Sequence, residues 1–166
     1  MKIISTLFIG VISVFMLSAQ TLTDDDLFLQ MKKLDSLLFE EGFNHCRMDI
    51  TNNLVHEELE FYHDQSGISN KQEFLDAVKN NICPEAEYKP IRKLVKESFM
   101  VFPLKNNNVL YGAIQQGSHD FYIETADQPL RYTSSGEFTH TWLLINYEWK
   151  LKTVLSYDHR YDSSKE

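Results

Sequence analysis

The sequence of 166 residues has little glycine, little proline and few basic side chains. Its six Gly and four Pro exclude a collagen-like or low-complexity chain. Sixteen Lys and Arg stand against 24 Asp and Glu, giving a formal net charge of −8. No nucleic-acid partner is expected, because phosphate binding needs a basic face. Apolar residues make up 43% and aromatic residues 13% of the chain, which is enough to build the core of one domain.

Several motifs that identify a class of reaction or cofactor are also absent from the sequence. The sequence contains no P-loop, no GxGxxG, no GxSxG, no HExxH and no CxxC. These absences remove the usual signatures of nucleotide binding, of a nucleophile elbow, of a helical zinc site and of thiol redox catalysis. No cofactor is therefore expected.

The first twenty residues have the layout of a secretory signal peptide. Lys2 supplies a positive charge, residues 3–17 are almost wholly apolar, and small residues follow at Ser18 and Ala19. The apolar run is shorter than the roughly twenty residues that span a bilayer, and three Asp follow it closely. The sequence predicts a signal peptide over residues 1–19 and a single domain over residues 20–166. The mature chain is expected in the periplasm or outside the cell, with no membrane association after cleavage.

Export changes the meaning of Cys46 and Cys83, since thiols pair in oxidising compartments. A bond between these two cysteines would close a loop across 37 positions. It would contribute about 3–4 kcal/mol on the chain-entropy model. The alternative is two separately buried thiols that behave as small apolar side chains.

The order of predicted elements is helices first and strands afterwards. Apolar residues recur at helical spacing after Thr23, which has the chemistry of an N-cap, and a second helix follows Ser69 or Asn70. Helices are predicted over residues 24–47 and 70–82, a turn or short helix over 49–53, and strands over 59–63, 91–104, 109–125, 137–145 and 149–159. Loops are predicted at 127–129 and 134–136. Helices gathered before a meander indicate an α+β fold, with the helices covering one face of a curved, mostly antiparallel sheet.

This order, with a set of short sequence stretches, resembles the nuclear transport factor 2-like superfamily, also called SnoaL-like or ketosteroid-isomerase-like. The nearest likeness is to its exported bacterial members of unknown function. The stretches are 59–64, 111–115, 117–122, 138–142, 149–151 and 156–159, within a likeness that covers residues 24–159. The resemblance implies a cone whose interior holds a small molecule or a catalytic site. It also implies a homodimer formed through the outer face of the sheet.

Four histidines share strand faces with apolar residues. Strict alternation puts His63 with Phe61, His119 with Phe121, His140 with Phe138 and Trp142, and His159 with Tyr157. If these faces are concave, the pocket is lined by His63, His119, Phe121, Phe138, His140, Trp142, Tyr157 and His159. A single β-bulge would reverse the assignment of a strand face. The alternative is that each imidazole is a core or rim residue bonded to a backbone carbonyl.

The same residues suggest acid–base chemistry more than metal binding. Imidazoles can ligate zinc, but no recognised ligand spacing is present, so no metal site is expected. A neutral histidine can abstract a proton near pH 7, and a carboxylate beside an apolar wall has a raised pKa. The candidate acids and bases are His119, His140, Asp64 and Asp158. Both aspartates equally suit turns or strand ends.

The leading prediction is an exported protein that binds a small molecule in an aromatic, histidine-lined pocket. Two alternatives stand beside it. One is a cofactor-free isomerase, lyase or hydrolase that uses a pocket His or Asp as general acid or base. The other is a homodimeric interaction module whose pocket is vestigial. The sequence does not identify the ligand.

Overall fold

The computed structural model describes residues 23–84 and 87–161, so the predicted signal peptide lies outside the described residues. The first helix, α1 (Asp24–Ser36), begins where the sequence predicts. Thr23 caps it, because its side chain accepts a hydrogen bond from the backbone N–H of Asp26 while the Asp26 carboxylate accepts one from the backbone N–H of Thr23. Leu27, Met31 and Leu34 form its buried stripe. The helix continues as the π-helical η1 (Leu37–Asn44) and ends slightly before the predicted end.

Two further helical segments complete one side of the molecule. The short α2 (Met48–Leu54) matches the predicted turn or short helix. The next helix, α3 (Lys71–Ala77), is capped by Asn70 and Glu73 in a reciprocal box and continues as η2 (Val78–Ile82). Its start and end agree with the prediction of a helix over 70–82.

The strands form one mixed sheet within the described residues. They are β1 (Val55–His63), β2 (Gly67–Ser69), β3 (Lys89–Leu94), β4 (Met100–Asn106), β5 (Val109–Thr125), β6 (Gln128–Ile145) and β7 (Glu148–Tyr161). Their order is β2-β1-β7-β6-β5-β3, and β4 pairs with the first part of β5. Every pairing is antiparallel except that of β1 with β7, which is parallel.

The strands differ from the sequence prediction at several points. The first strand begins earlier, at Val55, β2 was not predicted, and β6 begins at Gln128, inside the loop predicted over 127–129. The predicted strand over 91–104 is two strands, because a 3-10 turn, η3 (Lys96–Ser98), moves the chain from one half of β5 to the other. The predicted loop at 134–136 is wrong: Ser134 and Gly136 lie inside β6, which stays paired with both neighbours across a bulge. One bulge at Thr133 of β6 and one in β7 flank the Ser-Ser-Gly run, which itself stays within the sheet.

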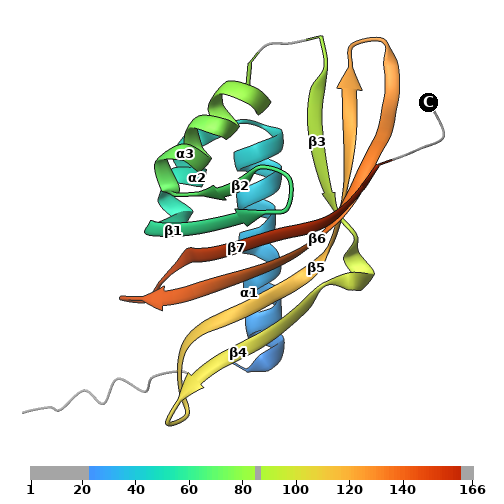
Figure 1. Ribbon diagram of the computed structural model, residues 1–166. Coiled ribbons are helices and arrows are strands. Elements are labelled where there is room, and N and C mark those ends of the chain that lie inside the picture. Colours follow the sequence, from blue (N-terminus) through green and yellow to red (C-terminus); the bar gives the residue numbers. More distant parts are fainter. Residues whose placement is uncertain (1–22, 85–86, 162–166) are drawn as a thin grey trace, which may run out of the picture.

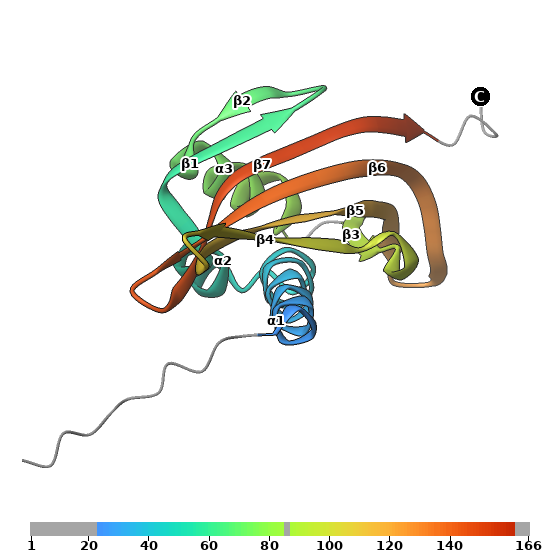
Figure 2. The same ribbon diagram turned by 90° about the horizontal axis from the view of Figure 1, so that it is seen from below.

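The helices cover one face of the curved sheet (Figure 1). Seen from below, β6 and β7 arch over α1 (Figure 2). Side chains from the helix and from the concave face share one core, in which Met31, Trp142 and Leu151 are fully buried. This arrangement confirms the predicted α+β class, with N-terminal helices on a curved and mostly antiparallel sheet.

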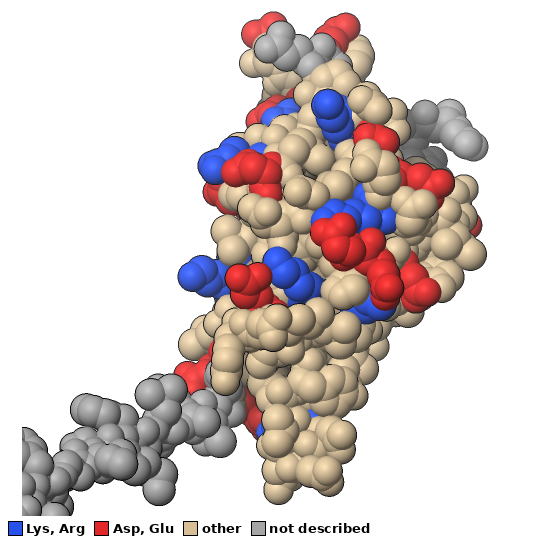
Figure 3. Space-filling view, turned by 90° about the vertical axis from the view of Figure 1, so that its left-hand side faces the viewer, with Lys and Arg blue, Asp and Glu red and all other residues tan. Residues whose placement is uncertain are grey.

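The outer surface carries mixed charge. Figure 3 shows one side of the molecule, on which Lys and Arg side chains are interspersed with Asp and Glu side chains. Exposed ion pairs include Lys71 with Glu57 (2.7 Å) and Lys152 with Glu58 (3.2 Å). In the part of the chain that the structure describes, no helix has the length and apolar character needed to cross a membrane.

Candidate functional site

A cavity of about 390 Å³ lies between the helices and the concave face of the sheet. Most of its wall is apolar and comes from two sides. The helical side is formed by Leu38, Phe39, Phe43, Phe74, Ala77, Val78 and Ile82, with Thr51 and Asn81; the sheet side is formed by Phe61, His63, His119, Phe121, His140, Leu151, Val154 and Ser156, with Ser66 and Pro90 near them in the lining.

The structure brings together four of the eight residues predicted to line the pocket. His63, His119, Phe121 and His140 are part of the wall. Two aromatic residues predicted for the lining, Phe138 and Trp142, are instead core residues beneath it, with 1% and 0% of their surface exposed. They share the concave face, but the histidines and the helices cover them. His159 does not line the cavity; its ring stacks on that of His63, with the ring centroids 4.5 Å apart.

Tyr157, which was also predicted to line the pocket, lies on the opposite face of the sheet. Trp142 pairs with Leu151 but Thr141 pairs with Thr153, so β7 contains one extra residue at that point. This bulge reverses the alternation, and Tyr157 faces the outer side of the sheet with 41% of its surface exposed. The prediction assumed unbroken alternation from Trp149 onward and is therefore wrong for Tyr157.

A second bulge returns His159 to the concave side. Tyr157 pairs with Glu137, but Arg160 pairs with Ser135, so β7 again has one residue more than β6. Asp158 occupies this position with a φ of 54°. Its carboxylate points outward to Arg160 at 3.4 Å. Asp158 therefore lies away from the cavity, and its prediction as a pocket acid or base is wrong.

A buried polar network lies directly behind the cavity. Arg92 on β3 donates two hydrogen bonds to the carboxylate of Asp35 on α1, at 2.7 and 3.0 Å. Gln115 donates to the same carboxylate at 3.1 Å. Its amide oxygen accepts from the Trp142 indole at 2.6 Å and lies 3.3 Å from Nδ1 of His140. The network fixes the sheet against the helix through charge-assisted hydrogen bonds.

Sequence reasoning missed this network. Arg92 is only 2% exposed, and its guanidinium lies 3.8 Å from the centre of the Phe39 ring. One signal was available, since Asp35 falls on the apolar stripe of α1 beside Leu34 and Leu38. A carboxylate at such a position needs a buried cation. The sequence does not say which of the basic residues supplies it.

The buried histidines are held neutral. Burial, and then the charge of Arg92, lower the pKa of His140 to about 3 and that of His119 to about 2. The Nε of Arg92 donates to Nδ1 of His119 at 3.4 Å, so a neutral His119 carries its proton on Nε2. That Nε2 is buried and has no hydrogen-bond partner. The hydroxyl of Thr51 is also buried without a partner, and both residues belong to the cavity wall.

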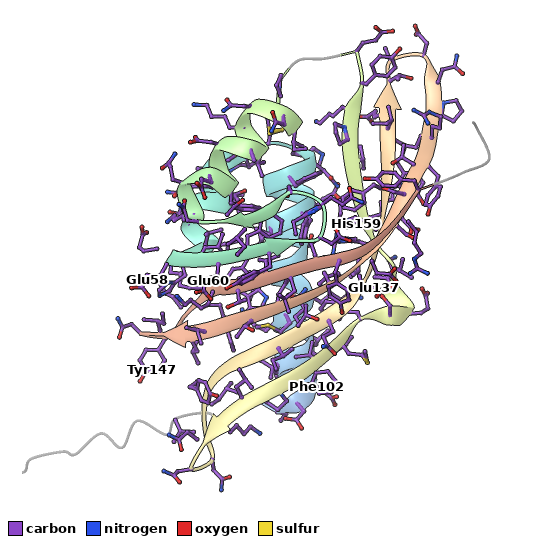
Figure 4. All side chains as sticks on the ribbon, in the orientation of Figure 1. Glu58, Glu60, Phe102, Glu137, Tyr147 and His159 are labelled. Atoms are coloured by element: carbon purple, nitrogen blue, oxygen red, sulfur yellow. A yellow bond between two sulfur atoms is a disulfide. The ribbon has the colours of Figure 1, made fainter. Side chains whose placement is uncertain are left out.

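Asp64 and the two remaining histidines form a second polar group at the edge of the cavity. Nδ1 of His159 lies 2.6 Å from the Asp64 carboxylate, which also accepts the backbone N–H of His159 at 3.1 Å. Nε2 of His159 lies 3.4 Å from the hydroxyl of Ser156. Burial is the main cause that lowers the pKa of His63, followed by the neighbouring His159. In Figure 4, His159 lies toward the C-terminal end of β7, far from Glu58 and Glu60 on β1.

Within the described residues, the side chains of His63, Asp64 and His159 lie close enough together to form a metal ligand set. Each offers one ligand atom, and these atoms lie within 4.8 Å of one another. Two of these groups already accept hydrogen bonds: Nδ1 of His63 accepts the backbone N–H of Gln65 at 3.1 Å, and Asp64 accepts from His159. A metal ion bound through Nδ1 of His63 would displace the hydrogen bond from Gln65.

Cys46 and Cys83 form a disulfide, with their Cα atoms 5.6 Å apart. The bond joins the turn after η1 to the end of η2. Phe43 and Ile82, which line the cavity, stand close to the two cysteines in the sequence. The crosslink therefore fixes the helical side of the cavity.

The comparisons with known proteins place the fold. The sequence matches no protein-family model and no curated protein. Among solved structures it is similar to a nuclear transport factor 2-like protein from Cytophaga hutchinsonii, with 11% identity and a TM-score of 0.57 over 81% of this chain and 98% of that chain. A nuclear transport factor 2-like superfamily protein from Salmonella enterica gives 12% identity and a TM-score of 0.63 over 87% and 96%.

A hexachlorocyclohexane dehydrochlorinase gives 12% identity and a TM-score of 0.60, over 84% of this chain and 94% of that chain. Identities this low establish architecture and carry no activity. The TM-scores of 0.57 to 0.63 over more than four fifths of this chain show a shared fold. The chain has the nuclear transport factor 2-like fold.

Proposed function

We propose that this chain is an exported protein that binds a small, mainly apolar molecule in the cavity between its helices and its sheet. The cavity itself carries the proposal. Its volume of about 390 Å³ lies within the range of roughly 300–1,000 Å³ typical of small-molecule pockets. An apolar wall with a few polar groups is the usual composition of such a pocket.

The polar groups suggest the chemistry of the ligand. Thr51 Oγ1 and His119 Nε2 are buried in the cavity wall without partners, although buried polar atoms in proteins are nearly always hydrogen-bonded. His119 donates at Nε2, so it suits a carbonyl or another acceptor. A flat apolar body bearing one carbonyl group fits both the wall and this donor.

Export is supported by the crosslink as well as by the first twenty residues. A disulfide between Cys46 and Cys83 is stable in a periplasm or outside the cell, whereas cytosolic thiols are kept reduced. The helical side of the cavity would then be fixed only after export.

Two matched probes test the binding proposal. 2-Acetonaphthone carries a ketone on an apolar body, and 2-ethylnaphthalene has a closely similar shape without the acceptor. We expect the purified chain to bind both saturably in calorimetric or fluorescence titrations. The ketone should bind about fivefold more tightly, because one net hydrogen bond contributes about 1 kcal/mol.

A pair of variants connects that binding to the cavity. Ala77 lines the cavity while remaining exposed, so Ala77→Trp can narrow it without overpacking the core. Lys79→Trp, on the same helical segment but outside the lining, is the control. We expect Ala77→Trp to weaken both probes at least tenfold and Lys79→Trp to leave them unchanged. Absence of saturable binding, or equal effects of the two variants, would contradict the proposal.

A further inference from the structure

Three side chains at the edge of the cavity form a continuous hydrogen-bonded relay. The Asp64 carboxylate lies 2.6 Å from Nδ1 of His159 and accepts the backbone N–H of His159 at 3.1 Å. These two contacts fix the orientation of the imidazole. A neutral His159 with its proton on Nδ1 presents a lone pair at Nε2. The hydroxyl of Ser156 lies 3.4 Å from that Nε2, and Ser156 lines the cavity. The order is hydroxyl, imidazole and carboxylate.

The backbone of β7 is built so that these groups meet. Ser156 and His159 are three positions apart, so unbroken alternation would place them on opposite faces of the strand. The bulge at Asp158, with a φ of 54°, inserts one residue and brings His159 to the side that Ser156 occupies. Bulges of this kind often re-aim a side chain beside an active site. Asp64 comes from the end of β1, which pairs with β7 at Ser156.

A hydrogen-bond donor stands on the other side of the same space. A Cβ placed on Gly136 would lie 3.0 Å from Nε2 of His159 and 3.1 Å from Nε2 of His119. Even a methyl group at Gly136 would crowd both nitrogens, so the two imidazoles pack closely against the glycine backbone. One nitrogen accepts a proton and the other, on His119, donates one. The two rings lie near each other, with centroids 6.2 Å apart, and a base beside a hydrogen-bond donor is what acyl transfer needs.

We infer that Ser156 is an acyl-accepting nucleophile, activated by His159 and positioned through Asp64, for small apolar esters bound in the cavity. The inference rests on the proposed function, since the cavity must first hold the substrate. His159 takes the Ser156 proton as Oγ bonds to the ester carbonyl carbon and the carbonyl π pair moves to oxygen. The tetrahedral adduct, with its oxyanion facing His119, expels the alcohol, which receives the proton from His159. Water then repeats the sequence on the acyl-enzyme, releasing the carboxylic acid and returning the proton to Ser156.

Phenylmethanesulfonyl fluoride tests the nucleophile directly. Its sulfur is attacked by an activated serine, fluoride leaves, and a stable sulfonyl adduct forms. We expect intact-mass and peptide mass spectrometry to find one adduct per chain, on Ser156. Ser156→Ala should form none. His159→Gln should react at least about a hundredfold more slowly, the lower bound for loss of a general base. Ser134→Ala, a buried serine on β6 outside the cavity lining, is the control and should react as the parent chain does.

Asp64 is a positioning residue in this scheme and has its own test. Asp64→Asn should slow the modification, while Asp64→Glu should restore part of the rate because it keeps a carboxylate for His159. A purely structural role would show the same loss in both variants. Hydrolysis of 4-nitrophenyl butyrate should follow the same ranking.

The outcomes separate this inference from the binding proposal. Modification of Ser156 that depends on His159 and is slowed by 2-acetonaphthone supports the relay. An adduct on another residue, or no adduct on a folded chain that still binds 2-acetonaphthone, overturns the relay and leaves the binding proposal standing. If neither binding nor modification occurs, the proposed function fails and the relay fails with it.

Discussion

Arg92 and Asp35 form a two-point ion pair that joins β3 to α1 behind the cavity, at 2.7 and 3.0 Å. Both side chains are almost fully buried. Burial is the main cause that lowers the pKa of Arg92, and the charge of Asp35 opposes that shift. The pair therefore ties the helix to the sheet beside the cavity.

Breaking this pair should be costly. We expect Arg92→Met or Asp35→Leu alone to lower the free energy of unfolding by about 3–5 kcal/mol, because each leaves an uncompensated buried charge. The double variant should be clearly more stable than the sum of the single losses predicts. Urea denaturation measures all three. Single losses below about 1 kcal/mol would show that the pair does not hold the fold together.

The disulfide should stabilise both the chain and the cavity. Replacing Cys46 and Cys83 together by Ser should lower the free energy of unfolding by about 3–4 kcal/mol, the loop-closure value for a separation of 37 residues. Because the bond joins the ends of η1 and η2, the variant should also bind 2-acetonaphthone more weakly. Thermal unfolding with and without a reductant checks the first effect. An unchanged melting temperature after complete reduction would contradict it.

Acid should destabilise the chain through its buried histidines. Folding lowers the pKa of His140 to about 3 and that of His119 to about 2, so the unfolded chain binds more protons below its own histidine pKa of about 6.5. Their contribution to stability is complete above pH 6.5 and is lost as the pH falls toward the folded values. We expect a slope of up to about 2.7 kcal/mol per pH unit between about pH 6 and pH 4.5.

His140→Phe isolates one of the two protons. Its slope of unfolding free energy against pH should be smaller by about 1.4 kcal/mol per unit, the value for one proton. Urea denaturation at several pH values above the range of carboxylate titration gives this slope. The same slope in the variant and the parent would contradict the assignment.

The bulge at Asp158 should be tolerant of residues that accept a positive φ and intolerant of others. Asp158→Gly should fold as well as the parent and keep the reactivity of Ser156, because glycine adopts this backbone without strain. Asp158→Val should cost about 1–3 kcal/mol and slow the modification of Ser156, since a β-branched residue resists that conformation. Equal behaviour of the two variants would show that the bulge does not position His159.

The sequence predicted most of the architecture because its signals are local. The caps at Thr23 and Asn70 and the apolar stripe of α1 identify the helices from neighbouring residues alone. Alternation along β5 and β6 identifies the strands and puts His119 and His140 on the concave face.

The errors lie where the structure depends on pairing between distant residues. The two bulges of β7 are defined by its pairing with β6, and the residues of β7 alone do not predict them. Tyr157 was therefore assigned to the wrong face. The partner of Asp35 is 57 positions away on another element, and no spacing rule links it to Arg92. Residues such as Ser156 become part of a candidate site only when the bulge brings His159 beside them.

The central claim is that the cavity binds a small apolar molecule, and methyl-detected NMR during a titration with 2-acetonaphthone tests it most directly. We expect saturable shifts in the methyl signals of Val78, Leu151 and Val154, which line the cavity, with little change at the exposed Ile68 and Val109. Shifts confined to exposed methyl groups, or no saturable shift up to the solubility limit of the ketone, would contradict it.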